Sequence, residues 1–182
     1  IARVPGGGYT ELGAILDTGV AGVIVPMINT AQEAEAVIDA VRYPPVGSRS
    51  GGGNRLSHVD PNYFEVANDK IIAGIMIETV EAVEQVDEIA AVDGLDVIFI
   101  GPGDLGHSVR ANGGSNEDHE AAMQKVLAAG KKHGVAVGLP LGNVEQAVER
   151  AAQGFQFFPV TSDVAEMEKG LKKIKEDIDA KT

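Results

Sequence analysis

Two apolar stretches in the middle of the chain, Ile71–Ile77 and Val97–Ile100, show no alternation of apolar and polar residues. Runs of this kind, rich in β-branched residues, predict strands that are covered on both faces, as in a parallel sheet. The segment between them, Thr79–Val92, carries apolar residues at the spacing of one helix face. The pattern therefore predicts a strand, a helix and a second strand parallel to the first.

The same alternation extends along the whole chain. Further strands are predicted at Ile1–Val4, Ala21–Met27, Val135–Leu139 and Phe155–Val160. Further helices are predicted at Tyr9–Thr18, Thr30–Val41, Asn62–Asn68, Asn116–His133 and Asn143–Gln153, and from Asp163 to the end of the chain. Capping boxes are expected at Thr30, Asn143 and Asp163, and long loops at Arg42–Asn54 and from Asp104 to Ser115.

Six strands, each followed by a helix, predict a parallel α/β architecture. A (β/α)₈ TIM barrel needs eight such units and about 250 residues, whereas this chain has 182 residues and begins in mid-pattern. We expect residues 1–182 to form a single barrel domain that lacks the first two strand–helix units. The alternative is an open doubly wound sheet, but no Gly-x-Gly-x-x-Gly follows the first strand.

Composition narrows the classes of function. A net charge of −12 argues against binding of nucleic acid or an anionic membrane. The chain has no cysteine, which excludes disulfides and thiolate chemistry. No apolar run approaches the roughly 20 residues that span a bilayer, so a soluble, cytoplasmic protein is expected.

Carboxylates stand at the ends of the two central strands. Glu78 directly follows one strand and Asp104 follows the other. Parallel strands deliver their carboxyl ends to one edge of a sheet, so the two side chains are expected to meet there. Two close carboxylates repel each other unless a cation separates them, and hard oxygen ligands suit Mg²⁺ or Mn²⁺, with Co²⁺ or Zn²⁺ as alternatives. The competing interpretation is that one or both acids cap the following helix.

Other candidate residues cluster around the same edge. The turn Gly101-Pro102-Gly103 could hold a substrate carboxylate through backbone N–H groups, or it could be a plain tight turn. Arg3, near the end of the first strand, could stabilise an oxyanion or form a surface ion pair. Asp17, near a helix end, is unfavourable to the helix dipole, which suggests a functional role against the alternative of a solvated side chain.

Lysine placement argues against imine chemistry. A Schiff-base aldolase needs a lysine near the carboxyl end of a strand. Lys70 precedes its strand, and the other lysines follow Asn116. A carbonyl substrate would therefore have to be activated by metal.

Six stretches together resemble the HpcH/HpaI aldolase family of metal-dependent, class II pyruvate aldolases. They are Ile1–Pro5, Ile15–Gly19, Val25–Met27, Arg42–Arg49, Ile77–Thr79 and Phe99–Leu105. The resemblance implies a TIM barrel, a hexamer built from dimers with the last helix exchanged between partners, and cleavage of a 4-hydroxy-2-oxo acid to pyruvate and an aldehyde.

By position, the resemblance implies specific roles for several residues. It assigns Glu78 and Asp104 as metal ligands, Gly103 and Asp104 as substrate contacts, Arg3 as the group that stabilises the enolate, and Asp17 as the residue that tunes a catalytic histidine.

The chain departs from the family at two points. Met76 stands where the family has a substrate-binding glutamine, and the family's catalytic histidine falls in a segment that this sequence does not contain. Two alternatives therefore stay open. One is a citrate-lyase-β-like acyl-CoA lyase, for which Arg42, Arg49 and Arg55 would be the basic patch; the other is a non-catalytic, incomplete barrel that binds a ligand or partner.

Overall fold

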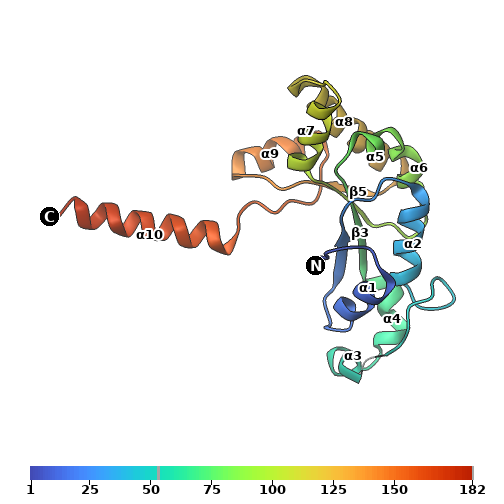
Figure 1. Cartoon of the computed structure of the whole chain (residues 1–182). Coiled ribbons are helices and arrows are strands. Elements are labelled where there is room, and N and C mark those ends of the chain that lie inside the picture. Colours follow the sequence, from blue (N-terminus) through green and yellow to red (C-terminus); the bar gives the residue numbers. More distant parts are fainter. Residues whose placement is uncertain (53, 182) are drawn as a thin grey trace.

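A curved, five-stranded parallel sheet forms the centre of the computed structural model, which describes residues 1–52 and 54–181 (Figure 1). The strands lie in chain order: β1 (Ala2–Arg3), β2 (Gly22–Val25), β3 (Ile72–Ile77), β4 (Val97–Ile100) and β5 (Ala136–Gly138). The predicted sixth strand contributes a single parallel bridge between Phe157 and Gly138. The parallel α/β class is thus confirmed, and β1 and β5 stand at the two ends of the described sheet.

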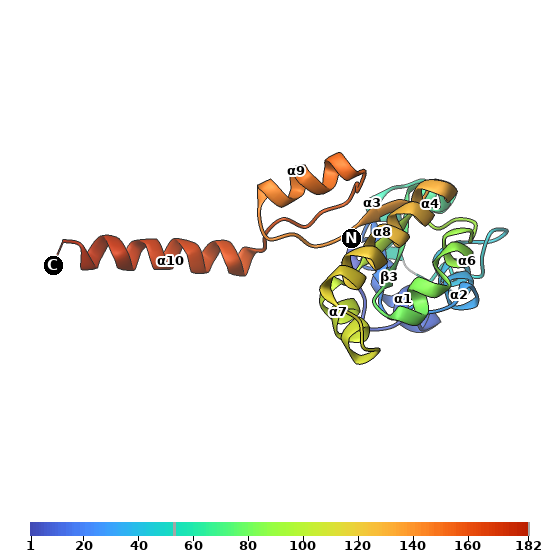
Figure 2. The same ribbon diagram turned by 90° about the horizontal axis from the view of Figure 1, so that it is seen from above.

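Helices follow the strands, and those up to α8 lie around the sheet, whereas α9 and α10 stand apart (Figures 1 and 2). They are α1 (Tyr9–Leu16), α2 (Ala31–Val41), α3 (Asn54–Val59), α4 (Tyr63–Lys70), α5 (Val80–Glu84), α6 (Val86–Ala90), α7 (Pro102–Ala111), α8 (Asn116–His133), α9 (Val144–Gln153) and α10 (Asp163–Asp179). Helix α10 projects away from the rest of the molecule (Figure 1). None of the described helices combines the length and apolar character that crossing a membrane requires.

Strand alternation gives the sheet two different faces. In β3, Ala73, Ile75 and Ile77 point outward into the main core, which they form together with the helices. Met76 points to the other, inner face, where it packs with Ile24 and Phe99 in a much smaller apolar cluster. Because successive residues of a strand alternate between faces, Glu78 follows Met76 toward the inner side.

One predicted loop contains a helix instead. The segment after Asp104 forms α7, which begins with Pro102 at its first position and buries Leu105 and Val109 one turn apart. A proline at that position and an i, i+4 apolar pair are ordinary helix signals, and the neighbouring glycines obscured them. The loop predicted at Arg42–Asn54 has no helix or strand over residues 42–52, and α3 begins at its last residue, Asn54. The predicted helix Thr79–Val92 is divided at Gln85 into α5 and α6.

The predicted helix starts are largely confirmed. Thr30 forms a complete capping box with Glu33. Asn143 accepts a hydrogen bond from the backbone of Gln146, although the Gln146 side chain accepts from Gly142 rather than closing the box. The last helix is capped by Ser162 and not by Asp163, because the Ser162 hydroxyl accepts the free N–H group of Ala165.

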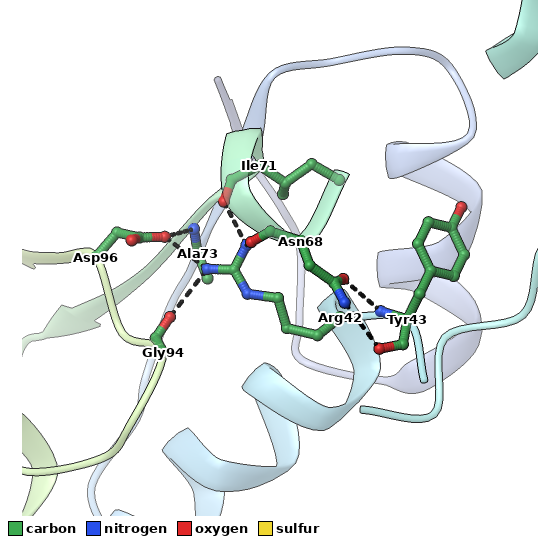
Figure 3. A network of polar contacts seen from close by, with 7 residues as sticks. All are labelled: Arg42, Tyr43, Asn68, Ile71, Ala73, Gly94 and Asp96. Carbon is green, nitrogen blue, oxygen red and sulfur yellow. Dashed lines mark hydrogen bonds and ion pairs between the residues drawn. The ribbon is translucent and has the colours of Figure 1, made fainter. Parts of the chain in front are cut away.

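Arg42 ties the amino ends of β3 and β4 together (Figure 3). Its side chain is buried and donates hydrogen bonds to the carbonyls of Asn68, Ile71 and Gly94 and to the carboxylate of Asp96. The same Asp96 oxygen accepts the backbone N–H of Ala73 at 2.8 Å. Arg42 therefore satisfies buried carbonyls that would otherwise lack partners.

Replacing Arg42 with methionine should destabilise the fold by about 3 kcal/mol, because buried carbonyls and Asp96 lose their donor. Urea unfolding measures this as a lower midpoint at unchanged slope. Arg55→Met is the matched control, since the Arg55 side chain is exposed and its loss should cost less than about 0.5 kcal/mol. Equal midpoints for the two variants would contradict this stabilising role of Arg42.

Candidate functional site

Glu78 lies at the carboxyl end of β3 and is only 2% exposed. It does not cap the next helix, because the neighbouring Thr79 hydroxyl accepts the N–H of Ala82 at the start of α5. One carboxylate oxygen, Oε1, is buried without a hydrogen-bond partner among the described residues. A buried carboxylate with an unused acceptor costs folding free energy, so its position is better explained by a ligand than by the fold.

Electrostatics around Glu78 point the same way. Burial raises the pKa of the Glu78 carboxyl, and the nearby Asp104 carboxylate raises it further. The Arg3 guanidinium and the Met27 backbone N–H act in the opposite direction and lower this pKa. The protein thus holds two acids together and supplies only part of the positive charge that would stabilise them.

Asp104 reaches Glu78 from the start of α7, the helix that follows β4. It is exposed and stands in the first turn of α7, where the helix dipole favours a negative charge. Gly101, the residue before this helix, packs directly on Glu78: a Cβ atom on Gly101 would lie 2.8 Å from the Glu78 Cγ. The structure therefore brings the two predicted carboxylates together at the carboxyl edge.

Arg3 and Met76 share the inner face with this pair. Arg3 of β1 stands in register with Ile24 of β2, and Ile24 with Gly74 of β3. Registered neighbours point to the same face of a parallel sheet, so Arg3 projects to the side of Met76 and Glu78. Met76 is 8% exposed and lies one pleat below Glu78. It offers an apolar surface, with no hydrogen-bonding amide, under the carboxylate pair.

The turn Gly101-Pro102-Gly103 provides fewer donors than the sequence suggests. The N–H of Gly101 already donates to the carbonyl of Ile77 at 3.2 Å, and Pro102 has no N–H. Gly103 and Asp104 lie in the first turn of α7, where backbone N–H groups have no partner within the helix. These two groups are therefore the donors that a substrate carboxylate could use.

Asp17 lies at the opposite, amino edge of the sheet. It ends α1 and pairs with the buried Arg49 at 3.0 Å. The Arg49 guanidinium also stacks over the Tyr43 ring, 4.6 Å from its centroid. Within this chain the structure does not bring Asp17 to Glu78, and its predicted part in catalysis stays a prediction.

The basic patch required by an acyl-CoA lyase is not assembled at the carboxyl edge. Arg42 and Arg49 are both buried and hydrogen-bonded at the amino edge. Only Arg55, in α3, remains exposed. Two of the three predicted cations are therefore occupied with holding the fold together and lie away from the carboxylate pair.

The residues present fit a divalent ion with few protein ligands. Within residues 1–52 and 54–181, no group of three or more His, Cys, Asp or Glu side chains is arranged to hold a metal. Glu78 and Asp104 would supply two hard oxygen ligands, and the other positions would be left to water and substrate. That sparse arrangement is typical of Mg²⁺, which keeps much of its hydration shell.

The chain is similar in sequence to known aldolases. The family model for HpcH/HpaI aldolase/citrate lyase matches residues 1–169. A 4-hydroxy-2-oxovalerate aldolase of Novosphingobium aromaticivorans is 39% identical over 157 residues, which cover 85% of this chain and 58% of that protein. The chain thus spans less than two thirds of that relative's length.

Solved structures show the same fold. A HpcH/HpaI aldolase/citrate lyase family protein from Burkholderia cenocepacia J2315 matches with a TM-score of 0.86 at 30% identity, covering 97% of this chain and 72% of that one. A more distant structure, CitE of Mycobacterium tuberculosis in complex with magnesium and pyruvate, has a TM-score of 0.56 at 18% identity, and 88% and 62% of the two chains are covered.

Replacing Gly101 with alanine should destabilise the protein by about 1–3 kcal/mol, because the added methyl group meets the buried Glu78 side chain. Gly103→Ala is the matched control two residues away: nothing lies within 4 Å of its Cβ position. Because alanine is favoured over glycine in a helix, Gly103→Ala should stabilise the protein by about 0.5–1 kcal/mol. Chemical unfolding of both variants tests the contrast, and a loss of stability in the control alone would refute the packing argument.

Proposed function

Because this chain belongs to the HpcH/HpaI aldolase/citrate lyase family, we propose that it acts as a metal-dependent carbon–carbon lyase. Its substrate would be a 4-hydroxy-2-oxo acid, cleaved to pyruvate and an aldehyde. The observation that carries the proposal is the unpartnered, buried Oε1 of Glu78 beside the carboxylate of Asp104.

Glu78 and Asp104 would hold a divalent cation, Mg²⁺ or Mn²⁺, at the carboxyl edge of the sheet. Such an ion supplies a Lewis acid for the carboxylate and keto oxygens of a 2-oxo acid. The magnesium and pyruvate in the M. tuberculosis protein of this fold are consistent with that choice of ion and substrate class.

The surrounding residues would bind the substrate and stabilise charge. The N–H groups of Gly103 and Asp104 would bind the substrate carboxylate at the start of α7. Arg3 would place its guanidinium near the keto oxygen, where negative charge develops as the C3–C4 bond breaks. Met76 would form the apolar floor of the site, so the substrate loses the amide contact that a glutamine would give.

Cleavage requires the C4 hydroxyl to lose a proton as the aldehyde leaves, and C3 of the pyruvate enolate to gain one. We assign the proton acceptor to no histidine of this chain. His107 contacts Arg110, and His133 contacts Asp87. His119 packs against Gly106 in the interface of α7 and α8, and His58 belongs to α3 at the amino edge.

We further propose that the described sheet is an arc of a (β/α)₈ barrel, of which residues 1–182 supply six strand–helix units. Three observations support this. The strands follow one another in chain order, the Gly138–Phe157 bridge continues the sheet, and helices α1, α2, α6 and α8 pack on the sheet and on one another. Figure 2 shows the arrangement from above. The likeness to the B. cenocepacia protein over 97% of the chain adds support.

Glu78→Gln should abolish Mn²⁺ binding in solution while the fold is retained, because a neutral amide is a poor ligand for a hard cation. Titration calorimetry measures the binding. Pyruvate release from a 4-hydroxy-2-oxo acid should depend on added Mg²⁺ and cease with EDTA. Glu84→Gln, on the same connection but away from the pair, is the control. Turnover that survives both EDTA and Glu78→Gln would rule out the proposed mechanism.

Helix α10 supports a further proposal, that the chain assembles with copies of itself. Its apolar residues recur every three or four positions and are all more than half exposed: Val164, Met167, Leu171, Ile174 and Ile178. An apolar stripe of this kind on a helix is buried in a soluble assembly. Helix α10 carries no buried residue in the described chain, and a second copy offers the covering surface.

Leu171→Glu should therefore shift the chain to a smaller species in size-exclusion chromatography with light scattering, since it places a charge in the stripe. Lys172→Ala is the control, because it changes the net charge by the same amount on the polar side of α10. If both variants elute as the unaltered chain does, α10 is not the assembly surface.

A further inference from the structure

Met27 adopts a backbone conformation that its side chain does not favour. Its φ is +57°, in the left-handed region, and it is the only described residue other than glycine with a positive φ. Unbranched, non-polar residues rarely occupy this region, and such strain persists only where the surroundings enforce it. Met27 stands two residues after β2, at the same edge of the sheet as Glu78.

Packing of the Met27 side chain does not explain the strain, because the side chain is 51% exposed. The reason must therefore lie in the backbone. The N–H of Met27 faces the Glu78 carboxylate closely enough to lower its pKa. Gly101 approaches the same carboxylate from the other side, so the head of Glu78 is confined between β2 and β4.

Hydrogen bonds on both sides hold the turn that contains Met27. The Thr79 hydroxyl, next to Glu78 in the chain, donates to the side chain of Asn29. The backbone N–H of Asn29 donates to the Glu33 carboxylate at 2.7 Å. Pro26 restricts the backbone on the other side of Met27. The turn Pro26–Asn29 is thus attached to α2 and to the residue that follows Glu78.

We propose that the left-handed backbone of Met27 is a positioning device for Glu78: the turn Pro26–Asn29 fixes the Met27 N–H against one side of the carboxylate and leaves Oε1 free for the cation. This inference rests on the proposed function, because it assigns the turn a role in metal binding. It adds a contact that depends on backbone conformation rather than on the identity of the side chain.

The experiment compares Mn²⁺ affinity, by titration calorimetry or electron paramagnetic resonance, in variants that differ in tolerance of a positive φ. Met27→Gly and Met27→Asn tolerate it, and they should bind Mn²⁺ within about twofold of the unaltered chain, with raised thermal midpoints. Met27→Val disfavours a positive φ. It should therefore weaken Mn²⁺ affinity about 10- to 100-fold, as the removal of contacts that orient a metal ligand typically does.

Asn29→Ala provides a second route that does not alter residue 27. It releases the turn from Thr79 and should weaken Mn²⁺ binding about tenfold, whether or not Met27→Val folds; circular dichroism verifies the fold of each variant. Unchanged affinity in Asn29→Ala, or a loss in Met27→Gly as large as that in Asn29→Ala, would overturn the inference.

The two proposals fail in different ways. If the unaltered chain binds Mn²⁺ and Glu78→Gln does not, the metal site stands, and the turn variants alone decide the role of Met27. If the unaltered chain binds no Mn²⁺, the proposed function is wrong, and the positioning role is wrong with it.

Discussion

The burial of the Glu78 carboxylate beside a second acid is the constraint on which the rest of the site depends. Burial and the Asp104 carboxylate both disfavour the charged form of Glu78. The fold nonetheless leaves Oε1 without a partner. Such an arrangement lowers stability in the free chain, and the proposed cation would offset that cost, which is the usual relation between a functional site and its scaffold.

The two edges of the sheet are divided between stability and function. At the amino edge, the buried arginines Arg42 and Arg49 are paired with Asp96 and Asp17 and hydrogen-bonded to nearby groups. At the carboxyl edge, Glu78 and Asp104 lie together with fewer compensating contacts. Parallel α/β folds commonly place their chemistry at the carboxyl edge and their stabilising contacts at the other, and the distribution of charge here follows that rule.

This division also bears on the functions that the sequence left open. An acyl-CoA lyase would need basic side chains near the carboxylate pair, and the two buried arginines are on the other side of the sheet. A small 2-oxo acid needs less: one cation, two backbone donors at the start of α7 and a guanidinium. The structure places the backbone donors, the guanidinium and an apolar surface at Met76 on the side of the carboxylate pair, which is consistent with the proposed substrate.

The sequence by itself determined the parallel α/β class, most strand and helix positions, and the meeting of Glu78 with Asp104. Periodicity and strand order carry that information, because parallel strands end at a common edge. It did not reveal α7, because the glycines obscured the helix signal of Pro102. It also did not show that the N–H of Gly101 is already bonded to the carbonyl of Ile77 and cannot bind a substrate. Nor did it show that Asp17 pairs with the buried Arg49, since that contact depends on how α1 runs back along the sheet.

Only the tertiary structure decided which polar groups are satisfied. Arg42 and Arg49 look like surface cations in the sequence, yet both are buried because carbonyls and carboxylates from distant segments surround them. The conformation of Met27 is likewise invisible in its side-chain chemistry, because the hydrogen bonds at Asn29 and the neighbouring strand impose it. Local pattern fixes the elements, while burial and long-range hydrogen bonding fix the roles of individual residues.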